Sequence, residues 1–171
     1  MLTMTVSGAR ATRFLLTACV LLAPAAASAS QVGSTLTVEA DVVANCTVSV
    51  GTVDFGDINP LAGVNINGSG TFNVTCTSGT TWTAAAGVGS GPSASYTTRK
   101  MSFGSNTLNY NLYTTSGYGT VWGDGTGGTG LLSGTGNGSA QTATVYGRIA
   151  SGQTTAPPGG YADSVSITVT Y

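Results

Sequence analysis

The sequence contains no histidine among its 171 residues. Histidine is the usual base of Ser-His-Asp and Cys-His catalysis and the commonest metal ligand, so its absence argues against both kinds of site. The acidic residues are scattered, and Asp54 and Asp57 are one of only two close pairs. They allow an acid pair or a calcium ligand set, but capping of a turn is the favoured interpretation. We expect no enzyme activity, no metal and no cofactor.

Charge is also scarce, with five basic and six acidic residues. Beyond residue 29 the only bases are Arg99, Lys100 and Arg148. Such a chain lacks the positive surface that binds nucleic acid or an anionic membrane. The GDGTGG stretch at residues 123–128 has no lysine and no following helix, so we expect no phosphate site there.

Long hydrophobic runs are missing, except for FLLTACVLLAPAAA near the N-terminus. Arg10 and Arg13 precede this run and a small-x-small motif ends at Ala29, which together predict a signal peptide over residues 1–29. The run is short for a membrane span. As an alternative, LTAC resembles a lipobox and would make Cys19 a lipidated first residue. We favour export with cleavage after Ala29 and no stable membrane insertion afterwards.

Cysteine is rare as well, and only Cys46 and Cys76 follow the predicted signal peptide. An even number of cysteines in an exported protein predicts a disulfide, with two free thiols as the alternative. The bridge would close a loop of about 30 residues, which the loop-entropy relation values at about 3–4 kcal/mol.

No segment after the signal peptide shows an apolar period of 3.6 at helical length. Frequent turn signals and β-branched residues predict an all-β sandwich or barrel. The expected strands are 46–50, 53–60, 70–76, 81–88, 99–103, 106–114, 140–149 and 161–171. A turn is expected at Asn67-Gly68. The glycine-rich residues 114–139 are interpreted as a surface connection with one short strand near Trp122; a ligand-binding loop is the alternative. Trp82 and Trp122 are expected to be packed.

Residues 31–42 alternate between polar and apolar side chains, the pattern of a half-buried strand. The apolar positions are Val32, Leu36, Val38, Ala40 and Val42. The same phase continues to Val50, and one strand of that length would span about 60 Å, too long for a sandwich. The stretch must therefore be divided near residues 43–45. We expect an N-terminal extension over residues 30–43 and a domain over residues 44–171.

Several segments, taken in order, are similar to the spore coat protein U domain family, whose members include subunits of archaic Csu-type chaperone–usher pili. They are ANCTVSVGTVDFG, GTFNVTCTSGTTWTAAAGVG, RKMSFGSNTLNYNLYT, VWGDG, TVYGRIASGQ and GGYADSVSITVTY. The main departure is the glycine-rich stretch between Trp122 and Ala140.

The resemblance implies an incomplete immunoglobulin-like β-sandwich that lacks its last strand and is completed by donor-strand exchange. Such subunits pass through the periplasm with a chaperone and an outer-membrane usher, and form a head-to-tail surface fibre. The donor role carries over to Val32, Leu36, Val38, Ala40 and Val42. The acceptor groove carries over to Cys46, Val48, Val50, Val165, Ile167, Val169 and Tyr171.

The favoured function is thus a structural pilus subunit in adhesion or biofilm formation. A spore coat or extracellular matrix protein of the same family is the first alternative, and a tip adhesin or lectin is the second. Tyr171 is expected either to contact the chaperone or to be a core aromatic residue. Arg148 and Asp163 are expected either to pair or to be solvated.

Overall fold

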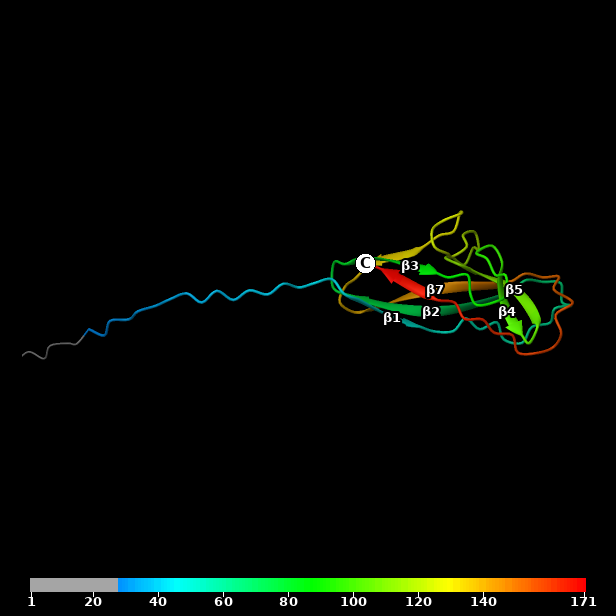
Figure 1. The fold of residues 1–171 in the computed structure, drawn as a ribbon, viewed down its shortest axis with the longest axis horizontal. Coiled ribbons are helices and arrows are strands. Elements are labelled where there is room, and N and C mark those ends of the chain that lie inside the picture. The colour runs from blue at the N-terminus through cyan, green and yellow to red at the C-terminus, as the bar shows by residue number, and fades with distance from the viewer. Residues whose placement is uncertain (1–27) are drawn as a thin grey trace, which may run out of the picture. The chain divides into compact units, whose positions relative to one another are not determined.

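The protein is an all-β sandwich in the computed structural model, which describes residues 28–171 (Figure 1). The strands are β1 (Cys46–Val50), β2 (Ile66–Cys76), β3 (Thr81–Ala86), β4 (Arg99–Phe103), β5 (Asn106–Tyr113), β6 (Leu132–Thr135), β7 (Ala140–Ile149) and β8 (Ile167–Thr170). They form a five-stranded sheet in the order β1-β2-β7-β5-β4 and a three-stranded sheet in the order β6-β3-β8. The chain divides between Glu39 and Ala40 into two compact units, and all the strands belong to the second, Ala40–Tyr171.

The long antiparallel pair β2 and β7 lies in the interior of the larger sheet (Figure 1). In this pair, Phe72 of β2 lies opposite Ala143 of β7. Alternate residues of β2 point inward, because successive side chains of a strand face opposite sides of the sheet. The inward side chains of both sheets make one core. Its buried members are Phe72, Val74, Cys76, Trp82, Ala84, Ala86, Leu108, Tyr110, Leu112, Trp122, Val145 and Ile149. The expected packing of both tryptophans is confirmed.

The final strand, β8, shows the expected alternation. Val165, Ile167 and Val169 are half-buried, whereas the serine and threonine residues between them are exposed. The strand is shorter than expected, because its ladder with β3 covers only Ile167–Thr170. Tyr171 is 56% exposed, so the prediction that it is a core aromatic residue is wrong.

Two expectations near the start of the domain are wrong. Residues 53–60 form no strand, and only Asp54 makes a single bridge to Ser69. Asn67-Gly68 is not a turn but lies inside β2. The reason is a close crossing of residues 52–54 over β2. A Cβ atom at Gly68 would lie 2.6 Å from the Asp54 carbonyl oxygen, so glycine is needed here for contact and not for turning.

The glycine-rich residues 114–139 contain β6, a strand that the sequence did not predict. Its signal is hidden by Gly134, whose missing side chain makes room for the Trp82 ring; a Cβ there would lie 2.6 Å from Trp82 Cζ2. The short extended piece expected near Trp122 is present as bridges at Val121 and Trp122. The stretch is therefore partly a sheet element and not only a surface connection.

Candidate functional site: an apolar groove between the sheet edges

A groove of about 370 Å³ opens between the chain after β1 and the chain leading into β8. One wall is formed by residues 50–55 and the other by residues 161–167. The floor belongs to the core and consists of Phe72, Met101, Tyr110, Leu112, Trp122 and Val145, with Gly70 and Thr71 beside them. The groove is thus a gap between the two sheets, lined mainly by apolar side chains.

The floor of the groove is rigidly packed. The rings of Phe72 and Trp122 stack with centroids 5.3 Å apart and planes 14° from parallel. The indole Nε1 of Trp122 donates a hydrogen bond of 2.8 Å to the carbonyl oxygen of Ala84 in β3. Because the polar atom of the indole is satisfied, the ring can present an apolar face without a buried unpaired donor.

Both walls carry free backbone edges. Within residues 28–171, β1 pairs only with β2, and β8 pairs only with β3. The stretch 163–165, just before β8, has no backbone–backbone hydrogen bond among those of the described chain. An unpaired edge beside an apolar face is a template for an added strand, which would satisfy both features at once.

A carboxylate holds the second wall in place. Asp163 Oδ1 accepts hydrogen bonds from the Ser90 amide (2.7 Å), the Ser90 hydroxyl (2.7 Å) and the Ser164 amide (2.8 Å). Its Oδ2 accepts a bond of 2.7 Å from the Tyr110 hydroxyl. Burial raises the pKa of Tyr110 above its ordinary value, and the hydrogen bond to Asp163 raises it further. The phenol therefore stays protonated and remains a donor.

Arg99 is fully buried behind the floor of the groove. Its guanidinium donates to the Gly87 carbonyl (2.7 and 2.9 Å), to the Trp122 carbonyl (2.7 Å) and to Asn111 Oδ1 (2.8 Å). Burial lowers the pKa of this group. Nothing in the sequence sets Arg99 apart from the neighbouring Lys100, which is only half-buried.

Three of the residues assigned to the groove from the sequence line it, namely Val50, Val165 and Ile167. The other residues assigned to the groove lie outside its lining, namely Cys46, Val48, Val169 and Tyr171. The floor residues and Asp163 were not assigned to the groove from the sequence. Alternation along the strands predicted burial of floor residues such as Phe72, Tyr110 and Leu112, but no local pattern indicated that they share one groove.

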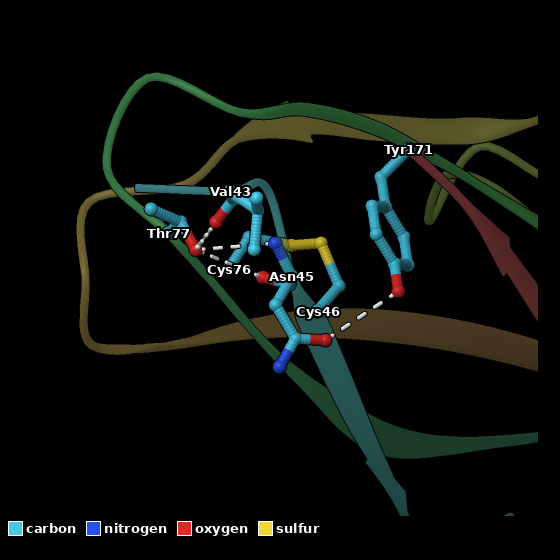
Figure 2. Close-up of a disulfide and its surroundings, with 6 residues drawn as sticks. All are labelled: Val43, Asn45, Cys46, Cys76, Thr77 and Tyr171. Carbon is cyan, nitrogen blue, oxygen red and sulfur yellow. Dashed lines mark hydrogen bonds between the residues drawn. A yellow bond between two sulfur atoms is a disulfide. The ribbon is translucent and has the colours of Figure 1, made fainter. Parts of the chain in front are cut away.

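Cys46 and Cys76 form the predicted disulfide, at directly opposite positions of β1 and β2 (Figure 2). Next to it, the Thr77 amide donates to the Asn45 carbonyl (2.9 Å), and the Asn45 amide donates to the Thr77 hydroxyl (3.1 Å). The same hydroxyl lies 3.5 Å from the Val43 carbonyl (Figure 2). Residues 43–45 are therefore fastened to the domain just before β1.

The predicted donor segment has no strand or helix between residues 28 and 45. The side chains of Val32, Leu36, Val38 and Val42 are between 83% and 97% exposed. Ala40 is exposed as well. These exposed apolar side chains alternate along the segment. With Ser34 as the one polar residue in the same phase, they provide a mainly apolar face for a partner.

Two smaller expectations are settled by the contacts. Arg148 does not pair with Asp163: its Nε donates to Asn67 Oδ1 (2.9 Å), and its guanidinium lies 3.6 Å from the Tyr118 ring centroid. Asp54 caps a turn, as favoured, by accepting a 2.9 Å hydrogen bond from the Gly56 amide.

Within residues 28–171, no three His, Cys, Asp or Glu side chains lie together so that they could hold a metal ion. No helix in this range is long and apolar enough to cross a membrane. The signal peptide was predicted over residues 1–29, and its first 27 residues, with the alternative lipid site at Cys19, lie outside the described residues.

A solved structure with a similar fold is a chain of the chaperone–tip adhesion subunit pre-assembly complex CsuC–CsuE, from the archaic chaperone–usher Csu pili of Acinetobacter baumannii. The match has a TM-score of 0.56 at 21% sequence identity, and it covers 76% of this chain but only 40% of the other. It supports an immunoglobulin-like sandwich. A search of curated proteins gave no match. A sequence model of the Spore Coat Protein U domain matches residues 32–168. With both strand edges open beside an apolar groove, the chain is an incomplete sandwich that belongs to the Spore Coat Protein U domain family.

Proposed function

We propose that the protein is a structural subunit of a surface fibre and that residues 30–43 of one copy fill the groove of the next. The observation that carries this proposal is the groove itself, which has an apolar floor and an unpaired backbone edge on each wall. The same chain carries an exposed extended segment with one apolar face. A single chain thus contains both the groove and a segment that could fill the groove of another copy.

The energy of such a joint is sufficient for a noncovalent fibre. Four large apolar side chains of the segment, each worth about 1.5–3 kcal/mol on burial, contribute about 6–12 kcal/mol before the cost of ordering the segment. Backbone hydrogen bonds to both walls add to the register and specificity of the inserted strand. Because the contact is head-to-tail and does not close on itself, it generates a filament.

The proposal also explains why a chaperone would be a partner. Before a donor strand arrives, the groove and its edges are an aggregation hazard that another chain must cover. The structural neighbour comes from a chaperone complex of a chaperone–usher pilus. We infer the same route here: export to the periplasm, capping by a chaperone, delivery to an outer-membrane usher and incorporation into an extracellular fibre with a role in adhesion or biofilm. This role is structural and not enzymatic.

The test is to substitute the apolar face of the segment and to look for polymers. Leu36→Asp with Val38→Asp is expected to abolish SDS-resistant ladders in unheated samples, because two charges cannot be buried in the groove. Thr35→Asp with Thr37→Asp is the matched control: it adds the same charge to the opposite face and should leave the ladders in place. Ladders that persist after deletion of residues 31–42 would contradict donor-strand exchange.

The spore coat or matrix alternative uses the same fold without a dedicated secretion route. Surface fractions from cells that lack the chaperone or the usher separate the two functions. A pilus subunit is expected to disappear from the surface of such cells, whereas a coat or matrix protein should remain. A tip adhesin would in addition bind glycans as a self-complemented monomer, which a glycan array measures.

A further inference from the structure

Resting on the proposed donor-strand function, we propose that Asp163 is a positioning residue: it holds the β8-side wall of the groove extended, so that the wall is ready for a donor strand before one is bound. This wall belongs to no ladder until Ile167, where β8 begins.

The backbone of the wall is attached only at its two ends. At one end, Ala162 and Ser102 exchange two hydrogen bonds of 2.8 and 3.1 Å. At the other end, the Gly87 amide donates to the Ser166 carbonyl at 2.8 Å. Between these points, in the structure as described, residues 163–165 make no backbone–backbone bond. Their backbone conformation must therefore be set by side chains.

Asp163 is the side chain that spans this gap. Its two carboxylate oxygens accept four hydrogen bonds, all between 2.7 and 2.8 Å. The donors belong to Ser90, in the loop before β4, to Tyr110 in β5, and to Ser164 in the wall itself. Hydrogen bonds to a charged acceptor are the stronger kind, so a single residue ties the wall to two other parts of the sandwich.

The loop before β4 is shaped around this carboxylate. Gly89 has a φ of +92°, in the left-handed region, and a Cβ atom built there would overlap Asp163 Oδ2. Only glycine allows both the backbone conformation and the close approach. The contact therefore depends on both segments: the wall supplies the carboxylate of Asp163, and the loop supplies the glycine that leaves room for it.

The clamp should matter most before a donor strand binds. Before a donor strand binds, no backbone–backbone hydrogen bond holds residues 163–165. Apart from the bonds of Asp163, the backbone there has one 3.3 Å hydrogen bond, from the Ser164 amide to the Ser90 hydroxyl. Once a donor strand has inserted, its own backbone hydrogen bonds hold the wall, and the contribution of Asp163 becomes partly redundant. A preorganised edge loses less conformational entropy when a strand is added, so both the affinity and the rate of insertion should depend on Asp163.

The experiment measures binding of a labelled peptide with the sequence of residues 30–43. The acceptor is the chain from Ser30 onward carrying Leu36→Asp and Val38→Asp, so that its own segment does not compete. Asp163→Asn in this acceptor is expected to weaken peptide binding about tenfold and to slow insertion. Asp57→Asn is the matched control, because Asp57 is exposed and lies outside the groove lining, and it should leave binding unchanged.

Milder variants keep the proposal testable if Asp163→Asn unfolds the empty acceptor. Tyr110→Phe removes one of the four donors and Ser90→Ala removes another, and each is expected to weaken binding by a smaller factor. Unchanged peptide binding in a folded Asp163→Asn variant would overturn the inference.

A second readout separates positioning from plain stability. In a self-complemented chain, with the sequence of residues 30–43 placed after Tyr171, Asp163→Asn should lower the melting temperature less than it does in the empty acceptor. Equal losses in the two forms would overturn the positioning role. Failure of the peptide to bind even the acceptor with Asp163 intact would instead overturn the donor-strand function itself, and this inference with it.

Discussion

Two charged side chains, Arg99 and Asp163, organise the polar contacts around the groove, although the protein as a whole contains few charges. They do so without pairing with each other directly. Arg99 donates to carbonyl oxygens and to Asn111, and Asp163 accepts from hydroxyl and amide groups. Each charge is compensated by several dipoles. For the buried Arg99, such dipoles are how a charge is tolerated without an ion pair, whereas Asp163 is half-buried.

Tyr110 makes the stability of the folded protein depend on pH. Its pKa is raised in the folded protein, mainly by burial, so the folded state keeps the phenol proton to higher pH than the unfolded state. The resulting stability is fully present below about pH 10, the ordinary value, and is lost as pH rises beyond it. The expected loss is up to about 1.4 kcal/mol per pH unit, measured as the urea unfolding free energy.

Tyr110→Phe removes the titrating group and is the control for this prediction. The variant should be less stable than the unsubstituted protein by a constant amount between pH 7 and pH 9, because it lacks the hydrogen bond to Asp163. Above pH 10 the difference is expected to shrink. A difference that stays constant to pH 11.5 would contradict the prediction.

At the scale of elements, strands with clear alternation and bounded by turn residues could be predicted closely from the sequence. The expected bounds of β1, β4 and β7 agree with the structure. The errors cluster at glycines whose purpose is contact, not turning. Gly68 sits in β2 beneath a crossing segment and Gly134 sits in β6 against Trp82, and neither arrangement can be read from neighbouring residues.

The residues of the candidate site could also be predicted only in part from the sequence. Val50, Val165 and Ile167 could be assigned to the groove only through the family resemblance, which implies a groove flanked by the apolar faces of the first and last strands. Asp163 could not be assigned, because its partners Ser90 and Tyr110 are 73 and 53 residues away in the chain. Contacts of that separation depend on the topology of the whole sandwich, which local patterns do not specify.

The glycines of β2 lead to a direct test. Gly70→Ala would place a Cβ atom 2.5 Å from the Thr52 carbonyl oxygen and 2.8 Å from Val53 Cγ2. Overpacking against backbone is expected to lower the unfolding free energy by about 1–3 kcal/mol, measured by urea denaturation. Gly119→Ala is the matched control: nothing lies within 4 Å of its Cβ position, and the change should stay within about 0.5 kcal/mol. Equal effects at the two sites would show that the crossing is not tight.

At the scale of the whole domain, the disulfide is the one covalent link between distant parts of the chain, with a sequence separation of 30 residues. Reduction followed by alkylation is expected to lower the unfolding free energy by about 3–4 kcal/mol, through greater freedom of the unfolded chain. Urea denaturation with and without reductant measures the loss. A Cys46→Ala, Cys76→Ala variant should show no further response to reductant, and an unchanged stability of the reduced protein would contradict the prediction.

The fastening of residues 43–45 beside this disulfide has a mechanical meaning for a fibre. If residues 30–43 join neighbouring subunits, any tension along the fibre enters each domain at Val43 and reaches β1 first. Cys46 is the first residue of β1, and its disulfide to Cys76 transfers the load at that point to β2. β2 is in turn held by its long ladder to β7. The disulfide therefore prevents tension from separating β1 from β2. Under load, we expect the noncovalent joints between subunits to dissociate before the domains unfold.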